Sequence, residues 1–397
     1  MLNINLIRGV FRDSKYGKCI FYVALTIYML VQFSTGTMIY DSLHIPWYIS
    51  ADLVYFSVFL VLVKIFFFDG FSDLKEMLIY VSVGLLLLIG CNNTLTYDIV
   101  YYYLFIVGAR NIGFDKIAKI FLVGIGFTLI CTIIAAKLGI IMGLTVGRSD
   151  SPVIRYALGT VYATDLAART FYLQLMYVVL RKFRLTLPEY IAGFAFSIMM
   201  YIITDTRVDF ILMLATLFLA LGYKYVVDII DFLGTKVMIL LGLVSIFGMI
   251  GLTYLYTPKY GILRILDKIL STRLQNGHGA FENYNVTVFG QYIFQQGNGG
   301  LHKGAFHYFF IDCTFVRVLM MNGVITFALF VWALCYMLKR FMDKQSYSLV
   351  IAIILVVISS LIDHHMTEIS FNIIFLAMFS NIDYFSKYSK NNSLFSI

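Results

Sequence analysis

The feature that most constrains this chain is a series of apolar runs, each about as long as a membrane is thick. A helix needs roughly 20 residues to cross the hydrocarbon core of a bilayer, and runs of that length recur along most of the 397 residues. Only 13% of the residues are charged, whereas about 25% of a soluble domain is charged. The sequence therefore predicts a single all-α, polytopic membrane domain over 1–397.

We expect about twelve membrane-spanning helices, separated by polar loops. All four prolines lie in these loops or at helix starts, where proline is tolerated. The first apolar run has no small-residue cleavage site, so we expect it to stay as a span and not to be removed as a signal peptide. The expected helices lie near 19–40, 47–68, 76–91, 94–109, 116–138, 158–180, 188–204, 207–224, 236–256, 314–338, 346–362 and 369–385.

Lysine and arginine set the expected orientation. If the N-terminus is cytoplasmic, most of the 30 Lys and Arg residues fall on the cytoplasmic side, as the positive-inside rule requires. Both termini are then cytoplasmic. The net charge of +8 is explained by topology, and we expect no nucleic-acid partner. The five cysteines show no metal-type spacing, so no disulfide framework, metal or cofactor is expected.

The cations left for the opposite, extracytoplasmic side are mostly arginines. Arg148 and Arg155 precede the sixth expected helix, Arg207 opens the eighth, and Arg317 lies in the first turn of the tenth. An arginine in the first turn opposes the helix dipole, but beside free N–H groups it suits an anion such as a phosphate. Each of these arginines could instead reach lipid headgroups or pair with a nearby carboxylate.

Arg169 is expected about three turns inside the sixth helix, roughly 15 Å from its start. A charge at that depth is costly, and it is either functional or paired. Asp165 lies four residues earlier on the same helix face. Two interpretations stay open: an internal pair between Asp165 and Arg169, or an Arg169 that reaches the same anion as the other arginines.

The longest loop, 257–312, is expected on the extracytoplasmic side between the ninth and tenth helices. Its first part has apolar residues at helical spacing, which predicts an amphipathic helix on the membrane surface, ending near Asn276 and Gly277. The remainder is rich in glycine and aromatic residues and could cover a site as a lid. Arg273, His278 and Asp312 are candidate site residues in this loop.

The turn between the last two expected helices places Asp363, His364, His365 and Glu368 together on the same side. A carboxylate near a histidine can form a general base pair, and a polar helix cap is the alternative interpretation. Two adjacent histidines point in different directions on a helix, so we do not expect them to share a metal ion.

Four segments, in order, resemble the Wzy-type polymerases that join O-antigen and capsule repeat units in bacteria. The resemblance covers about a fifth of the chain by motif, and the hydropathy profile extends it. Thr160, Thr272 and Asp363 depart from residues often found in the family, which leaves the donor sugar open. The segments are RYALGTVYATDLAAR (155–169), LDKILSTRLQNGHGAFENYNVTVFG (266–290), FFIDCTFVRVLMMNGVI (309–325) and LIDHHMTEISFN (361–372).

The resemblance implies a membrane glycosyltransferase of the C type in the bacterial cytoplasmic (inner) membrane. Such an enzyme would move a growing glycan from undecaprenyl diphosphate to the next lipid-linked repeat unit on the outer face. The product would be O-antigen, capsule or exopolysaccharide, and a chain-length regulator is a conceivable partner. The family implies an inverting reaction without a metal.

Without a metal, arginines and helix N-termini must stabilise the departing lipid diphosphate. The acceptor hydroxyl needs a base, for which we rank His278 first and then Glu368 or His365. Asp165, Asp312, Asp363 and His364 are further candidate site residues without an assigned role. The diphosphate candidates are Arg148, Arg155, Arg207 and Arg273, followed by Arg169 and Arg317.

Two alternatives remain at this point. An O-antigen ligase would use the same donor with a different acceptor. A flippase for lipid-linked saccharides would catalyse no chemistry. It should carry charges at several depths and often shows repeated halves, and we find no internal repeat.

Overall fold

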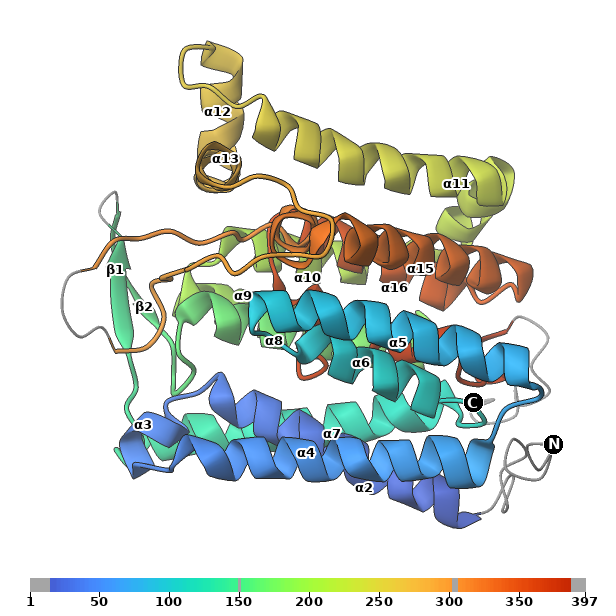
Figure 1. The fold of residues 1–397 in the computed structure, drawn as a ribbon. Coiled ribbons are helices and arrows are strands. Elements are labelled where there is room, and N and C mark those ends of the chain that lie inside the picture. Colours follow the sequence, from blue (N-terminus) through green and yellow to red (C-terminus); the bar gives the residue numbers. More distant parts are fainter. Residues whose placement is uncertain (1–14, 149–150, 302–305, 387–397) are drawn as a thin grey trace.

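The computed structural model describes residues 15–148, 151–301 and 306–386, which form a bundle of long helices lying side by side (Figure 1). A two-stranded antiparallel hairpin is the departure from an all-α fold. The elements before the middle of the chain are α2 (Lys15–Thr35), α3 (Ile39–Leu43), α4 (Trp47–Val63), α5 (Leu74–Thr94), α6 (Asp98–Gly108), α7 (Phe114–Lys137), β1 (Thr145–Arg148), β2 (Ser151–Tyr156) and α8 (Ala163–Leu180).

The second half continues the bundle and adds two short helices outside it. Two stretches of π-helix, Lys64–Asp69 and Val318–Asn322, extend α4 and precede α15. The elements are α9 (Leu187–Thr204), α10 (Arg207–Leu221), α11 (Tyr223–Tyr254), α12 (Gly261–Ile269), α13 (Arg273–Asn283), α14 (Thr314–Arg317), α15 (Gly323–Asp343) and α16 (Tyr347–Ser360).

Seven of the described helices are long and apolar enough to cross a membrane, which confirms a helical membrane protein. Helices α6 and α16 are also apolar but shorter. Many large apolar side chains on the outside of the bundle are exposed, for example Phe127 at 68% and Phe232 at 89%. Such a surface is typical of a protein whose solvent is lipid.

Local sequence signals explain where several helices begin or bend. Asp73 caps α5 by accepting a hydrogen bond from the N–H of Glu76. Thr186 and Glu189 form a capping box at the start of α9. Helix α11 bends at Gly234, whose φ of 68° suits glycine, so the predicted span 236–256 is the straight part after the bend.

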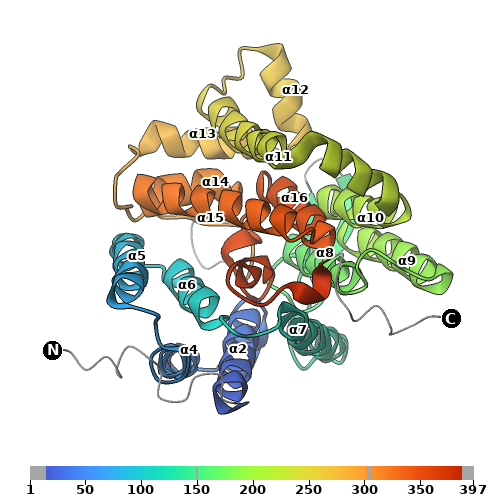
Figure 2. The ribbon, with the colours of Figure 1, turned by 90° about the vertical axis from the view of Figure 1, so that its right-hand side faces the viewer.

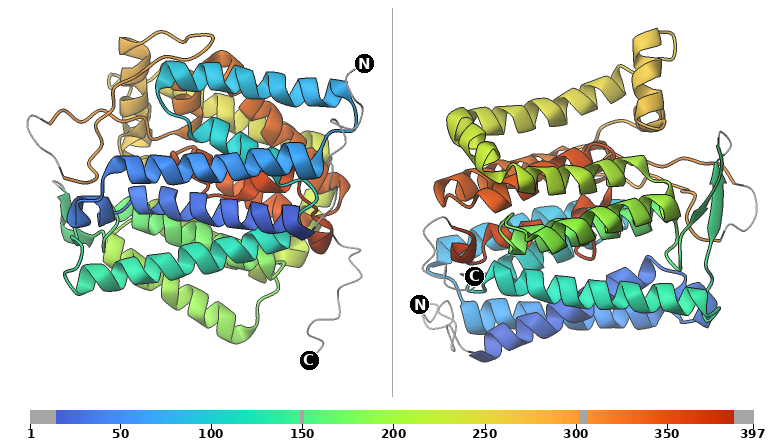
Figure 3. Two further views of the ribbon diagram at one scale, coloured as in Figure 1. Left: turned by 60° about the horizontal axis from the view of Figure 1, so that its bottom comes forward. Right: turned by 180° about the vertical axis from the view of Figure 1, so that it is seen from behind.

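The molecule has two distinct ends. Figures 1 and 3 place the hairpin, α3, α12 and α13 at one end, which we call the hairpin end, and the start of α2 at the other. The last described turn also lies at this other end, because Asp383 pairs with Lys344 after α15 and Phe385 packs on Phe114 at the start of α7. The described chain therefore begins and ends on the same side of the bundle.

The prediction of a helix over 369–385 is wrong. After α16 the chain forms only short 3-10 turns, at His365–Thr367, Ile374–Met378 and Asp383–Phe385. This irregular segment runs through the middle of the bundle, enclosed by helices (Figure 2). Its side chains are mostly buried and apolar, so hydropathy alone cannot distinguish it from a helix.

Side chains supply the hydrogen bonds that a helix would have made for itself. Arg340 donates to the carbonyl groups of Ala377, Met378 (2.6 Å) and Ser380 (2.7 Å). Unpaired backbone groups inside a membrane cost several kcal/mol each. Arg340, expected only as a topology marker, thus holds the irregular segment in place.

We predict that Arg340→Ala destabilises the protein by roughly 3 kcal/mol or more, because three buried carbonyl groups lose their donor. Thermal unfolding in detergent measures this. Lys339→Ala is the matched control, because Lys339 is exposed and its substitution removes the same positive charge. Equal melting temperatures for the two variants would contradict this role for Arg340.

Candidate functional site

A polar pocket lies at the hairpin end, where α10 and α13 begin and α16 ends; we call it the Arg273 pocket. It brings together residues from five separate parts of the sequence. The charged and ionisable residues that line it are Arg207, Asp209, Arg273, Asp312, Asp363, His364 and His365. The pocket therefore contains both acidic and basic groups, whereas the sequence predicted a cationic pocket.

The break between α12 and α13 positions Arg273. The predicted amphipathic helix exists as α12, but it ends at Ile269, and the expected stop at Asn276 is wrong because α13 runs through it. The carboxylate of Asp267, which is buried, accepts hydrogen bonds from the N–H groups of Leu274 (2.9 Å) and Gln275 (3.1 Å). This cap starts a new helix and turns its first residue, Arg273, toward the pocket.

Backbone carbonyl groups hold the guanidinium of Arg273. Its Nε donates to the carbonyl of Ile362 at 2.7 Å, and its Nη1 donates to those of Leu270 and Ser271 at 3.3 Å each. A carbonyl orients an arginine without cancelling its charge, as a carboxylate would.

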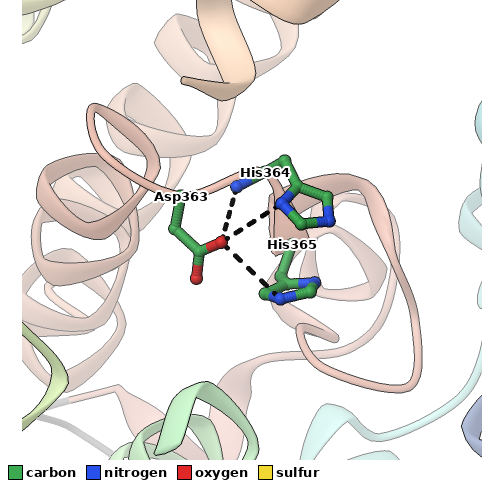
Figure 4. A group of neighbouring side chains, drawn as sticks. All are labelled: Asp363, His364 and His365. Carbon is green, nitrogen blue, oxygen red and sulfur yellow. Dashed lines mark hydrogen bonds and ion pairs between the residues drawn. The ribbon is translucent and has the colours of Figure 1, made fainter. Parts of the chain in front are cut away.

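The turn after α16 brings the predicted acidic and histidine residues together (Figure 4). The Oδ1 atom of Asp363 lies 3.5 Å from Nδ1 of His364 and 3.6 Å from Nε2 of His365. Glu368 lies on the other side of His365, with its Oε1 3.2 Å from Nδ1. The expectation that the two histidines point apart is wrong, because this turn is not helical and their ring centroids are 4.1 Å apart.

The two neighbouring histidines differ in protonation state. Burial lowers the pKa of His365, but the carboxylates of Asp363 and Glu368 outweigh it and raise the pKa well above its usual value. Burial and the positive His365 lower the pKa of His364 well below its usual value. His365 is therefore an imidazolium at neutral pH, whereas His364 is neutral.

The two carboxylates of this turn also differ. Burial raises the pKa of Asp363, against the opposing effect of His365. Burial also acts to raise the pKa of Glu368, but His365 outweighs it and the pKa is lowered. Of the two carboxylates, Asp363 is the one that lines the Arg273 pocket.

The predicted internal pair between Asp165 and Arg169 does not form. Asp165 instead faces His365, with 3.6 Å between Oδ1 and Nε2. The guanidinium of Arg169 is buried between the rings of Phe33 (4.3 Å) and Phe371 (3.9 Å). Aromatic rings, rather than a carboxylate, surround this charge at depth.

Arg317 lies behind the turn and is held by neutral oxygens. Its Nη1 donates to Oε1 of Gln295 at 2.8 Å, and its guanidinium lies 5.0 Å from the Phe310 ring centre. The negative charges of Glu368 and Asp312 stabilise the positive charge of this guanidinium. Burial raises the pKa of Asp312, against the effect of Arg273.

The remaining predicted arginines differ in exposure. Arg207 is exposed at the first turn of α10 and lines the pocket. Arg155 is buried and donates to the Thr204 carbonyl (2.7 Å) and to Oγ1 of Thr206 (3.2 Å), which fixes the turn that carries Arg207. Arg148 ends β1, and its side chain lies outside the described part of the structure.

Some arginines pair with carboxylates, whereas others in the described chain, among them Arg340 at the end opposite the hairpin, do not. At the end opposite the hairpin, Arg110 pairs with Glu76 (3.6 Å) and Arg181 with Glu189 (2.7 Å). In the described parts of the chain, no carboxylate oxygen lies within 4.0 Å of the guanidinium nitrogens of four arginines at the hairpin end. These four are Arg169, Arg207, Arg273 and Arg317.

His278, the first choice for a base from the sequence, does not line the Arg273 pocket. Its Nδ1 contacts the carbonyl of Thr253 at 3.1 Å, and its Nε2 lies 3.3 Å from Glu282. It joins α13 to the end of α11. Sequence analysis did not select Asp209 as a site residue, although its place two residues after Arg207, in the same first turn, was a usable signal.

Asp363, His364 and His365 form the group best suited to hold a metal ion among the described residues. Each offers one ligand atom, and these atoms lie within 4.8 Å of one another. Imidazole and carboxylate are ligands that zinc accepts. Against this, a proton on His365 and the charge of Arg273 compete with a bound cation.

No protein-family model, curated protein or solved structure matches the chain.

We predict a pH-dependent stabilisation from His365. Because its folded-state pKa is raised, its contribution is complete below the unfolded value of about 6.5 and is lost as the pH rises through the folded value. Melting temperatures of wild type and His365→Gln, measured from pH 6.5 upward, should converge as the pH rises. A difference that grows with pH would show that His365 is neutral in the folded state.

Proposed function

We propose that this protein polymerises lipid-linked oligosaccharide repeat units, moving the growing glycan from undecaprenyl diphosphate to the next lipid-linked unit. The observation that carries the proposal is the Arg273 pocket. Two arginines without an ion-pair partner among the described residues meet there with a carboxylate of raised pKa and a neutral histidine. An anionic leaving group and an acceptor hydroxyl need these two kinds of group.

The proposed reaction is a displacement at the anomeric carbon of the donor sugar. The acceptor hydroxyl oxygen forms the new bond to that carbon, while the bond from the carbon to the diphosphate oxygen breaks. The electron pair leaves with the lipid diphosphate, and the hydroxyl proton goes to the carboxylate of Asp363. Attack opposite the leaving group inverts the anomeric centre.

Arg207 and Arg273 are the proposed partners of the departing diphosphate. Both line the pocket, and both begin a helix, so the helix N-termini add positive potential at the same place. Arg317 and Arg169 lie deeper and add positive potential without the exposure of Arg207. Arg155 acts indirectly by holding the turn beside Thr206.

Asp363 is the proposed proton acceptor, ahead of Glu368, His365 and His278. His365 is already protonated and keeps Asp363 charged and oriented from 3.6 Å. Glu368 and Asp165 in turn hold His365. His278 lies outside the pocket and serves α13 packing.

The proposed setting is the bacterial cytoplasmic membrane, crossed by about twelve segments, with the hairpin end on the outer face and both termini in the cytoplasm. The cation distribution supports it: lysines and paired arginines gather at the end where the described chain begins. Arg273 at the start of α13 bonds to the carbonyl of Ile362, just after α16, which supports the role of the described part of 257–312 as a cover over the pocket.

We predict that Arg207→Ala lowers glycan transfer by about 100-fold, the typical cost of removing one group that stabilises the leaving charge. Polymer length in cells, read on a gel, measures this. Arg264→Ala on α12 is the control, because Arg264 is an exposed arginine at the same end but outside the pocket. Normal long polymer in Arg207→Ala cells would contradict the site, provided that both proteins insert.

We predict that transfer needs no metal ion. Because the arginines supply the positive charge, EDTA should leave the rate of the purified protein unchanged. Loss of activity with EDTA that added zinc or manganese restores would overturn this prediction. Asp363, His364 and His365 would then be the residues to substitute in a search for the metal ligands.

A further inference from the structure

A second polar pocket opens at the hairpin end, between α2, α4 and α6; we call it the Asp98 pocket. It is separate from the Arg273 pocket, and the two share no lining residue. Its chemistry is different, because no lysine or arginine lines it. The residues that matter are Tyr28, Gln32, Trp47, Tyr55, Asp98 and Tyr101.

The carboxylate of Asp98 is fixed and yet accessible. Its Oδ1 accepts hydrogen bonds from Nε2 of Gln32 at 2.9 Å and from the hydroxyl of Tyr28 at 3.3 Å. Its Oδ2 has no hydrogen-bond partner among the described residues, and the side chain is exposed to the pocket. A carboxylate held by two donors is a preorganised acceptor for the hydroxyl groups of a ligand.

Aromatic side chains form the walls. Trp47 and Tyr55 are 78% and 61% exposed, and Tyr101 stacks on Tyr97 with 6.1 Å between ring centres. Flat rings pack against the C–H face of a pyranose, while a carboxylate binds the hydroxyl groups at its edge. With no cation in its lining, the pocket is unsuited to a phosphate.

We propose that the Asp98 pocket binds a sugar ring of the lipid-linked acceptor. This inference rests on the proposed function and adds a saccharide subsite to it. Gln32, which lines the Asp98 pocket, also bonds to the segment after α16: its Oε1 accepts a hydrogen bond from the N–H of Ser370 at 2.9 Å, two residues after Glu368. The Asp98 pocket is thus one side chain away from the segment that carries Asp363 and His365.

A lipid amine headgroup is the competing occupant, because a carboxylate with aromatic rings also suits an ammonium group. The experiment must therefore test sugars and amines as ligands of the same pocket. Full-length protein in phosphatidylglycerol nanodiscs is titrated with methyl glycosides of the common hexoses and N-acetylhexosamines, and separately with choline and ethanolamine. Binding is followed by saturation-transfer NMR.

The key variant is Asp98→Asn, which keeps the shape of the side chain and removes its charge. Asp52→Asn is the matched control, since Asp52 is an exposed aspartate on α4 that does not line the pocket. Trp47→Ala and Tyr48→Ala form a second pair, in which only Trp47 lines the pocket. Because Trp47 is exposed, this pair keeps the test valid if Asp98→Asn fails to fold.

We expect at least one glycoside to bind wild type and to bind Asp98→Asn and Trp47→Ala about tenfold more weakly, with both controls unchanged. Binding that is indifferent to Asp98 and Trp47 would overturn the proposal. So would binding of choline or ethanolamine, and of no glycoside, that depends on Asp98.

The two proposals fail separately. If polymer forms at a normal KM for the acceptor in Asp98→Asn, the subsite is wrong and the polymerase function stands. If glycosides bind through Asp98 but no polymer forms, the function is wrong and the saccharide site stands.

Discussion

The fold depends on how the backbone N–H and C=O groups of a non-helical segment find hydrogen-bond partners inside a bundle of membrane helices. The segment 361–385 cannot bond to itself as a helix does, and lipid offers no partners. Side chains from other elements bond it along its length. The hydroxyl of Thr314 donates to the carbonyl of Asp363 (2.6 Å), Gln32 accepts from Ser370, and Tyr102 donates to Asn372. The segment is thereby held in place with a side-chain geometry different from that of a helix.

That geometry makes the site possible. In a helix, consecutive side chains point about 100° apart, so Asp363, His364 and His365 could not converge. In the irregular turn they meet, and Arg273 reaches the same place because it bonds to the carbonyl of Ile362. Carbonyl groups outside the α-helices position arginines, that of Ile362 at the site (Arg273) and those of Ala377, Met378 and Ser380 at the opposite end (Arg340).

Sequence reasoning succeeded where one physical signal decides the outcome. Length and hydropathy predicted apolar helices long enough to cross a membrane, of which the described chain contains seven, and Arg207 was correctly predicted to begin its helix. It failed where hydrogen bonding between distant residues decides. The apolar composition of 369–385 suggested a helix, and only the partners of that segment in space, such as Arg340, show why it is not one.

The candidate site was predicted in part for the same reason. Arg273, Asp312 and residues of the 361–372 turn were candidate site residues, and the pocket is lined by Arg273, Asp312 and three of the turn's candidates, Asp363, His364 and His365. The pairing of Asp165 with His365, rather than with Arg169, depends on a turn whose shape the sequence does not reveal. Asp98 was not predicted as a site residue, because an aspartate in the first turn of a helix is common and stabilises the helix dipole.

The most direct test is to give the purified protein one defined undecaprenyl-diphosphate-linked repeat unit and to separate the products by size. If the unpaired arginines at the hairpin end stabilise a departing diphosphate, a ladder of longer glycans and free undecaprenyl diphosphate should appear together. Unchanged substrate, found on both faces of a proteoliposome that contains the protein, would contradict this account and identify a flippase.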